Sequence, residues 1–125
     1  MKILSYRDLK VWQLAMDFVV AVYKVTRGFP ATEQYGLTSQ IQRAAVSVPA
    51  NIAEGQGRAH LNEYLHHLSF ARGSLMEIET HLLIAERLGY LDPRDSKQLL
   101  SAASDIGRML NALSRSLKAK RPPAP

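Results

Sequence analysis

Apolar residues recur three and four positions apart in four segments of the chain, which is the spacing of one face of an α-helix. We expect helices over about residues 6–27, 33–54, 61–88 and 93–118. No segment combines strand-like alternation with hairpin chemistry, so the pattern predicts an all-α protein. The segments are separated by residues that end one helix or begin the next: Gly28, Pro30, Gly55, Gly57, Gly89, Asp92 and Pro93.

The connections between the expected helices are only a few residues long, and short connections make consecutive long helices antiparallel neighbours. We therefore predict one domain over residues 1–119, an antiparallel up-down-up-down four-helix bundle, followed by a disordered tail over residues 120–125. At 125 residues the chain is long enough for one hydrophobic core.

Local features refine this expectation. Ser5 and Asp8 have the spacing of a capping box for the first helix. Pro49 lacks a backbone donor and should kink or split the second helix. Gly73 lowers helix propensity by about 1 kcal/mol, and we expect a neighbouring backbone to approach the third helix closely there. The fourth helix carries a coiled-coil-like apolar seam: Leu99, Ala103, Ile106, Leu110, Leu113 and Leu117.

The first helix is far more apolar than one face of a monomeric bundle requires. Its polar residues form one narrow stripe, whereas an apolar arc of roughly 100° suffices for a surface helix. Left uncovered, the additional apolar surface of this helix would be an exposed hydrophobic patch, so we expect another chain to cover it. We predict a homo-oligomer with Trp12, Met16 and Val19 in its interface.

Opposite the apolar side of the second helix, short polar and amide side chains follow helical spacing, where a solvated face would be richer in lysine. These groups are suited to a hydrogen-bonded network, and a plain wet surface is the competing interpretation. We predict a buried structural network formed by Arg43, Asn51 and Glu54.

The formal net charge of +5 is concentrated at the carboxyl end. The chain before Pro93 contains nine basic and nine acidic side chains, and the remainder contains seven basic and two acidic ones. Such an uneven distribution of charge favours an anionic partner. The competing interpretation is a solvated helix face that ends in a frayed basic segment. Our candidate nucleic-acid-binding residues are Arg108, Arg115, Lys118, Lys120 and Arg121, the first three on one side of the fourth helix.

The residues argue against an enzyme. The chain lacks cysteine, which excludes disulfides, thiolate metal sites and cysteine nucleophiles. Glu63 and His66 match one Glu-x-x-His element of a di-iron bundle, but the sequence has no second such element. Gly55-Gln56-Gly57 lacks the third glycine and the preceding strand of a nucleotide site. We expect no catalytic residues, no metal and no cofactor.

The sequence also lacks the features of a membrane or exported protein. The amino terminus has no signal-peptide core, and the apolar first helix is interrupted by Asp17 before it reaches about 18 apolar residues. We expect a cytoplasmic protein without a membrane partner.

Several motifs together resemble a known family. They are Ser5 to Trp12 (SYRDLKVW), Gly36 to Ala45 (GLTSQIQRAA) and Ser47 to Gly55 (SVPANIAEG), continued by Glu63-Tyr64, Ala71 to Ser74 (ARGS) and Glu77 to Thr80 (EIET). This combination resembles the four-helix bundle proteins encoded in intervening sequences of bacterial large-subunit ribosomal RNA genes. The resemblance covers about residues 5–91 by motif and the fourth helix by pattern only.

The resemblance implies a cytoplasmic bacterial four-helix bundle, and related members form ring-shaped homopentamers. A related group, the accessory variability determinants of diversity-generating retroelements, binds nucleic acid and a reverse transcriptase through basic surface, whereas other members have no assigned activity. Our leading hypothesis is a non-enzymatic oligomer that binds RNA, DNA or a ribonucleoprotein through the basic fourth helix. The alternative hypothesis is a protein–protein scaffold without a nucleic-acid role. A third hypothesis is a carboxylate–histidine metalloenzyme.

Overall fold

The structure is a computed structural model that describes residues 3–120. Two short 3₁₀ turns, η1 (Tyr6–Asp8) and η2 (Ala31–Glu33), precede the first and second helices. No strand occurs in the described part of the chain, and the predicted all-α class is confirmed. The four long helices are α1 (Lys10–Thr26), α2 (Leu37–Gln56), α3 (Leu61–Arg87) and α4 (Pro93–Lys118).

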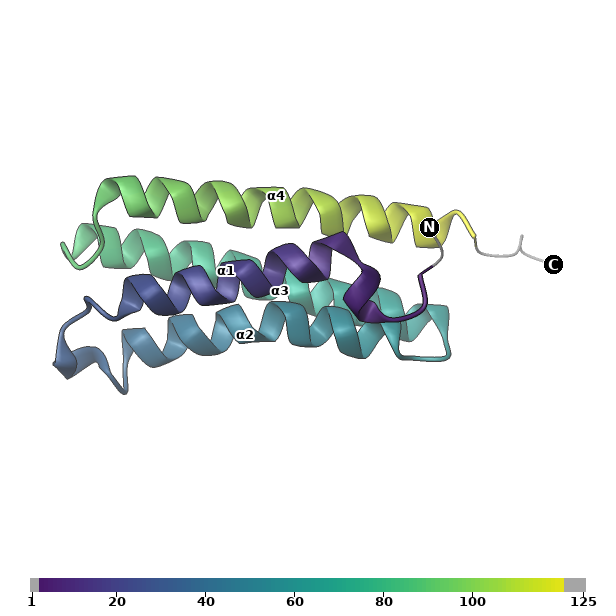
Figure 1. Cartoon of the computed structure of the whole chain (residues 1–125), viewed down its shortest axis with the longest axis horizontal. Coiled ribbons are helices and arrows are strands. Elements are labelled where there is room, and N and C mark those ends of the chain that lie inside the picture. Colours follow the sequence, from purple (N-terminus) through teal and green to yellow (C-terminus); the bar gives the residue numbers. More distant parts are fainter. Residues whose placement is uncertain (1–2, 121–125) are drawn as a thin grey trace.

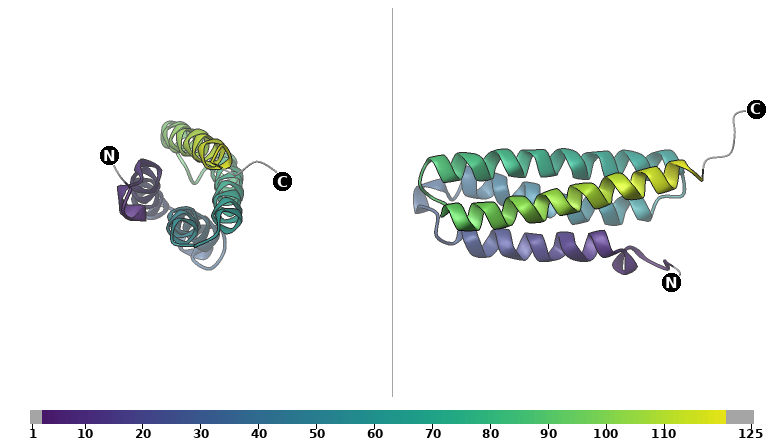
Figure 2. Two further views of the ribbon diagram at one scale, coloured as in Figure 1. Left: turned by 90° about the vertical axis from the view of Figure 1, so that its right-hand side faces the viewer. Right: turned by 90° about the horizontal axis from the view of Figure 1, so that it is seen from above.

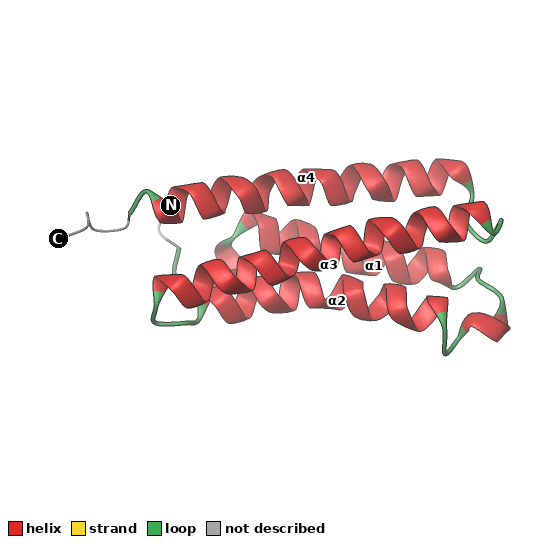
Figure 3. Ribbon diagram, turned by 180° about the vertical axis from the view of Figure 1, so that it is seen from behind, coloured by secondary structure: helices red, strands yellow, loops and turns green. Residues whose placement is uncertain are grey.

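Consecutive helices run in opposite directions and lie side by side (Figures 1 and 3). Residues 57–60 join α2 to α3 and residues 88–92 join α3 to α4, lengths that allow only an immediate reversal of direction. Each helix packs against its neighbours in the chain, and α4 closes the bundle on α1. Within residues 3–120, the diagonal pairs α1–α3 and α2–α4 have no Cα atoms within 8 Å of each other. This is the predicted up-down-up-down bundle.

The four helix–helix interfaces differ in closeness. α2 and α3 have the most extensive contact, and α1 and α4 have the least extensive one. The end-on view in Figure 2 shows α1 and α4 spread apart. The bundle is therefore tight on its α2–α3 side and open on its α1–α4 side.

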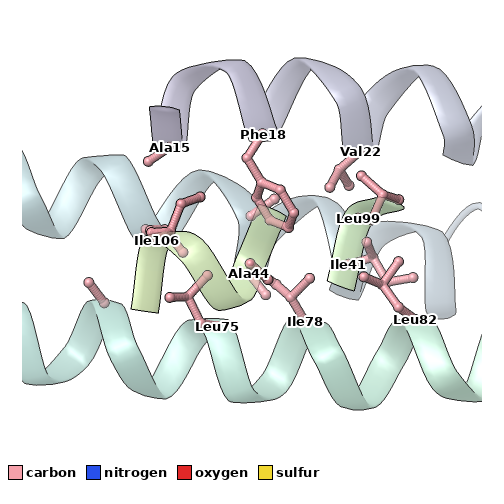
Figure 4. Packing of buried hydrophobic residues seen from close by; sticks show 14 of the residues in the cluster. Ala15, Phe18, Val22, Ile41, Ala44, Leu75, Ile78, Leu82, Leu99 and Ile106 are labelled. Carbon is pink, nitrogen blue, oxygen red and sulfur yellow. The ribbon is translucent and has the colours of Figure 1, made fainter. Parts of the chain in front are cut away.

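The core is formed by apolar side chains from all four helices (Figure 4). Phe18 of α1, Leu75 and Ile78 of α3 and Ile106 of α4 meet near its centre and are almost completely buried. The apolar seam predicted for α4 is confirmed in its first four positions, which are buried. Leu113 and Leu117 pack against the core and are partly buried.

The amino-terminal segment differs from its prediction. The Ser5–Asp8 capping box is present, with Asp8 Oδ2 accepting hydrogen bonds from the Leu4 and Ser5 amides at 2.9 and 3.0 Å. It caps the η1 turn and not α1, because Leu9 is extended (φ −75°, ψ 122°) and α1 begins only at Lys10.

The start and the middle of α2 also differ from the prediction. Glu33 lies in η2, and its Oε1 accepts a hydrogen bond at 3.2 Å from the amide of Leu37, where the helix begins. Pro49 lies inside a continuous α2, so the predicted split is wrong. Pro49 is buried, and packing on α1 and α3 holds the helix together despite the missing donor.

The close backbone approach predicted at Gly73 is wrong. A Cβ atom added there would have no neighbour within 4 Å. The close approach occurs at Gly55 of α2, where an added Cβ would lie 2.8 Å from the Cβ of His67 and 3.2 Å from the carbonyl oxygen of Tyr64. The close approach of α2 and α3 therefore lies near their connection. It requires a glycine at position 55 of α2 and not at position 73 of α3.

Candidate nucleic-acid interface

One face of α4 is lined by basic and serine side chains along most of its length, and we call this face the basic stripe. Its members recur three, four and seven residues apart and are all exposed. The buried seam occupies the opposite side of the helix, so the charges are accessible without being part of the core. From first to last the stripe spans about 36 Å at 1.5 Å per residue. Its members are Arg94, Lys97, Ser101, Ser104, Arg108, Arg115 and Lys118.

Arg108 is engaged within the chain. Its guanidinium forms an ion pair with Asp105, one turn earlier on α4, and donates a hydrogen bond to Ser104 Oγ at 3.0 Å. The pair is exposed, so it contributes little stability, but it neutralises part of the Arg108 charge. Among the predicted nucleic-acid-binding residues that the structure describes, Arg108 is therefore the one whose charge is partly neutralised.

Arg115, Lys118 and Lys120 lie at the carboxyl end of α4, and all three are exposed. Among residues 3–120, none of them forms an ion pair. The carboxyl end of a helix carries partial negative charge, so basic residues here also stabilise the helix. Arg121 and the rest of the predicted tail after Lys120 lie outside the described residues.

A chain of polar contacts crosses from α2 to α3, although not through the three residues predicted. Ser47 and Ser74 share a hydrogen bond of 2.8 Å between their hydroxyls. Asn51 Nδ2 donates hydrogen bonds to the Ser47 carbonyl and hydroxyl oxygens at 2.9 and 3.0 Å. Asn51 Oδ1 lies 3.1 Å from Nδ1 of His67 and, as an amide oxygen, accepts the hydrogen bond from it. All four side chains are partly buried, so the contacts fix the register of α2 against α3.

The prediction that Arg43 and Glu54 are buried in this network is wrong for the described chain. Arg43 is exposed and takes no part in the hydrogen bonds between Ser47, Asn51, His67 and Ser74. The Glu54 side chain is 52% exposed and pairs with Arg58 at 2.8 Å, with Nδ1 of His67 3.9 Å away. Both side chains are exposed on α2 and lie outside the partly buried network.

The partners that sequence reasoning missed are Ser74 and His67. Neither was singled out by the sequence pattern: Ser74 stands within the ARGS motif and His67 directly follows His66. Serine inside a long helix was the available signal, because its hydroxyl needs a partner when a second helix covers it.

Comparison with known proteins places this fold in a family. Residues 7–112 match the family described as 23S rRNA-intervening sequence protein. The chain belongs to this family. A crystal structure of a protein with unknown function from the S23 ribosomal protein family of Bacteroides thetaiotaomicron is similar, with a TM-score of 0.76 over 84% of this chain and 98% of that chain. The two are 20% identical in sequence, which shows a shared fold. No curated protein matches the chain.

The stretch from Ser47 to Gly55 contributes to the interface between α2 and α3. Ser47 and Asn51 supply its polar contacts, and Gly55 lets α3 approach at Tyr64 and His67. Burial raises the pKa of the Tyr64 hydroxyl. Helix packing therefore accounts for Ser47, Asn51 and Gly55 in this stretch.

The predicted interface residues of α1 lie on one side of the helix but differ in exposure. Met16 is 42% exposed, whereas Trp12 and Val19 are partly buried against the core. The Trp12 ring packs edge-on against Tyr6 of η1, with ring centroids 5.2 Å apart. This contact covers part of the apolar surplus within the chain, which the sequence pattern did not reveal.

Two further observations bear on the alternatives. Within residues 3–120, no three His, Cys, Asp or Glu side chains are grouped so that they could hold a metal ion. No helix in the same part of the chain is long and apolar enough to cross a membrane.

Proposed function

We propose that this protein is a non-enzymatic, cytoplasmic homo-oligomer that binds RNA through the carboxyl-terminal half of α4. The observation that carries the proposal is the group of exposed basic side chains at the carboxyl end of α4: Arg115, Lys118 and Lys120 form no ion pair within residues 3–120. An exposed row of cations on a rigid helix suits a phosphate backbone. The family description refers to 23S rRNA, so RNA is the first nucleic acid to test.

The contacts we propose are chiefly ionic. Arg115, Lys118 and Lys120 lie within about two turns of one another, and their charges are not neutralised within residues 3–120. Basic side chains that meet phosphates carry little sequence information. Binding should therefore weaken steeply with salt and depend little on sequence.

Assembly would strengthen this binding. A symmetric oligomer repeats the basic stripe once per subunit, and simultaneous contacts convert weak sites into usable avidity. Resemblance to ring-shaped relatives favours a pentamer, whose mass would be about 70 kDa from five copies of the 13.9 kDa chain. Light scattering at micromolar concentration that detects only the monomer mass would contradict this part of the proposal.

The binding experiment compares the parent with two variants of equal charge. The first variant changes Arg115, Lys118 and Lys120 to glutamine. The second changes three exposed arginines of α2 and α3 to glutamine, namely Arg43, Arg72 and Arg87. Fluorescence anisotropy with a labelled RNA is measured at several salt concentrations. We expect the first variant to lose affinity and to lower the slope of log K against log salt by about 2–3 units. Equal behaviour of the two variants would remove α4 from the mechanism.

A protein–protein scaffold is the second candidate, and the outer face of α3 supports it. Phe70, Met76 and Leu83 are between 47% and 58% exposed on this helix. Exposed apolar groups on one helix can form a partner-binding surface. Absence of RNA binding by the parent at low salt would favour this candidate.

A further inference from the structure

The open side of the bundle contains an apolar groove between α1 and α4, with a volume of about 310 Å³. Its apolar walls extend from Leu14 to Val25 on α1 and from Leu99 to Ile106 on α4. Three carboxylates line its margin, those of Asp17, Asp95 and Asp105, and no basic side chain does. Asp105 is paired with Arg108, whereas Asp17 and Asp95 form no ion pair within residues 3–120. We call this feature the acidic groove.

A second apolar surface lies on the other side of α1, where α1 meets α2. Met16, Val20 and Tyr23 of α1 and Val46 of α2 are exposed by 42%, 51%, 40% and 43%. The hollow beside them is bordered by two cations, Lys24 and Arg27, both exposed. We call Met16, Val20, Tyr23 and Val46 the apolar patch. The two surfaces thus have the same apolar character, and the unpaired charges beside them are opposite: Asp17 and Asp95 at the groove, Lys24 and Arg27 at the patch.

The two surfaces lie at the same level along the bundle. The acidic groove extends along α1 from Leu14 to Val25, and the apolar patch occupies α1 from Met16 to Tyr23. Since α4 runs antiparallel to α1, Asp95 near its start lies at the same end of the bundle as Lys24 and Arg27 near the end of α1 (Figure 1). A rotation about an axis parallel to the helices would therefore bring the patch of one copy against the groove of another without a shift along the axis.

We propose that the acidic groove is the docking site for the apolar patch of a second copy of this chain. Met16, Val20 and Tyr23 of one subunit insert between α1 and α4 of the next, and Lys24 and Arg27 meet Asp95. The two surfaces are different and lie on adjacent faces of the bundle, so the contact is heterologous and the rotation generates a closed ring. This inference rests on the self-association in the proposed function and adds which surfaces meet.

Cysteine cross-linking tests the contact directly, because the chain contains no cysteine of its own. Val20→Cys in the patch and Ala102→Cys in the groove are made as separate single variants. We expect disulfide-linked dimers when the two are mixed and oxidised, and only traces with either alone. Dimers of Val20→Cys alone, without cross-linking in the mixture, would show a two-fold contact and overturn the heterologous arrangement.

Charge reversal supplies an independent test. One variant carries Asp95→Lys, and the other carries Lys24→Glu together with Arg27→Glu. We expect each variant by itself to need at least a tenfold higher protein concentration to assemble. An equimolar mixture of the two variants should regain hetero-dimers. Glu77→Lys on the exposed face of α3 is the matched control and should assemble like the parent. Light scattering measures the mass, and circular dichroism confirms that each variant is folded. A monomeric parent would overturn the assembly itself, whereas an oligomeric parent unaffected by all reversals and without the mixed cross-link would overturn only this interface.

Discussion

Gly55 of α2 lies directly against His67 of α3: a Cβ atom added at Gly55 would be 2.8 Å from the Cβ of His67, closer than packed side chains allow. The same added atom would lie 3.2 Å from the carbonyl oxygen of Tyr64, which is backbone and cannot rotate away. Even alanine would force the two helices apart. The register set by Asn51 and His67 depends on this closeness.

We therefore predict that Gly55→Ala destabilises the protein by about 1–3 kcal/mol, the range for overpacking a well-packed interior. Gly73→Ala is the control, because an added Cβ there meets nothing within 4 Å. Removing a glycine from an exposed helix should stabilise by about 0.5–1 kcal/mol. Urea denaturation at equal protein concentration measures both, since assembly adds its own stability. Equal effects of the two substitutions would show that α2 and α3 are not in close contact at Gly55.

The polar contacts between α2 and α3 give a second prediction. Asn51→Ala should destabilise by about 1–3 kcal/mol, because it leaves Nδ1 of the partly buried His67 without this hydrogen bond and removes the Asn51 bond to the Ser47 hydroxyl, which keeps Ser74. Arg43→Ala, on the exposed margin of the same helix, should change the free energy of unfolding by less than about 0.5 kcal/mol. Thermal melts of the two variants separate these expectations, and a larger loss for Arg43→Ala would restore Arg43 to the network.

The Asp105 ion pair leads to a prediction about RNA binding. Arg115→Gln should lower the salt slope by roughly one unit if its guanidinium meets one phosphate. Arg108→Gln should lower it less, because Asp105 already neutralises part of that charge. Asp105→Asn should raise affinity by freeing Arg108. Anisotropy titrations of the three variants at matched salt test this order, and a decrease in affinity for Asp105→Asn would contradict it.

The start of α4 gives a prediction about pH. The Asp92 side chain accepts a hydrogen bond from the Arg94 amide at 2.8 Å, and this bond lowers the pKa of the Asp92 carboxyl below its ordinary value of 3.8. A lowered pKa in the folded state stabilises the fold above pH 3.8, and this contribution is lost as pH falls through the lowered value.

Asp92→Asn can still cap the helix but cannot titrate. We expect the difference in unfolding free energy between the parent and Asp92→Asn to be constant from pH 5 to 7. The parent should then lose its advantage progressively below about pH 4. Urea melts from pH 3 to 7 measure the difference, and a constant value over the whole range would show that the Asp92 carboxylate does not cap α4.

Much of the fold was predictable because it depends on local spacing. The breaks at Gly57, Gly89 and Pro93 and the apolar seam of α4 follow from periodicity and helix-end chemistry within one segment. The errors concern relations between segments. The close approach of two helices expected at Gly73 occurs at Gly55. Arg43 is exposed although a buried network was expected there, because the spacing of residues along one helix does not show how much of its surface a neighbouring helix covers.

The sequence by itself determined four helices, their antiparallel order, the family and the position of the positive charge, since each follows from residue type and short-range spacing. Only the tertiary structure decided which polar side chains meet across α2 and α3, that Asp105 neutralises part of Arg108, and that α1 and α4 leave an acidic groove open. These features depend on the distances and rotations between packed helices. Such quantities are set by the combined shapes of many side chains, and no single segment contains them.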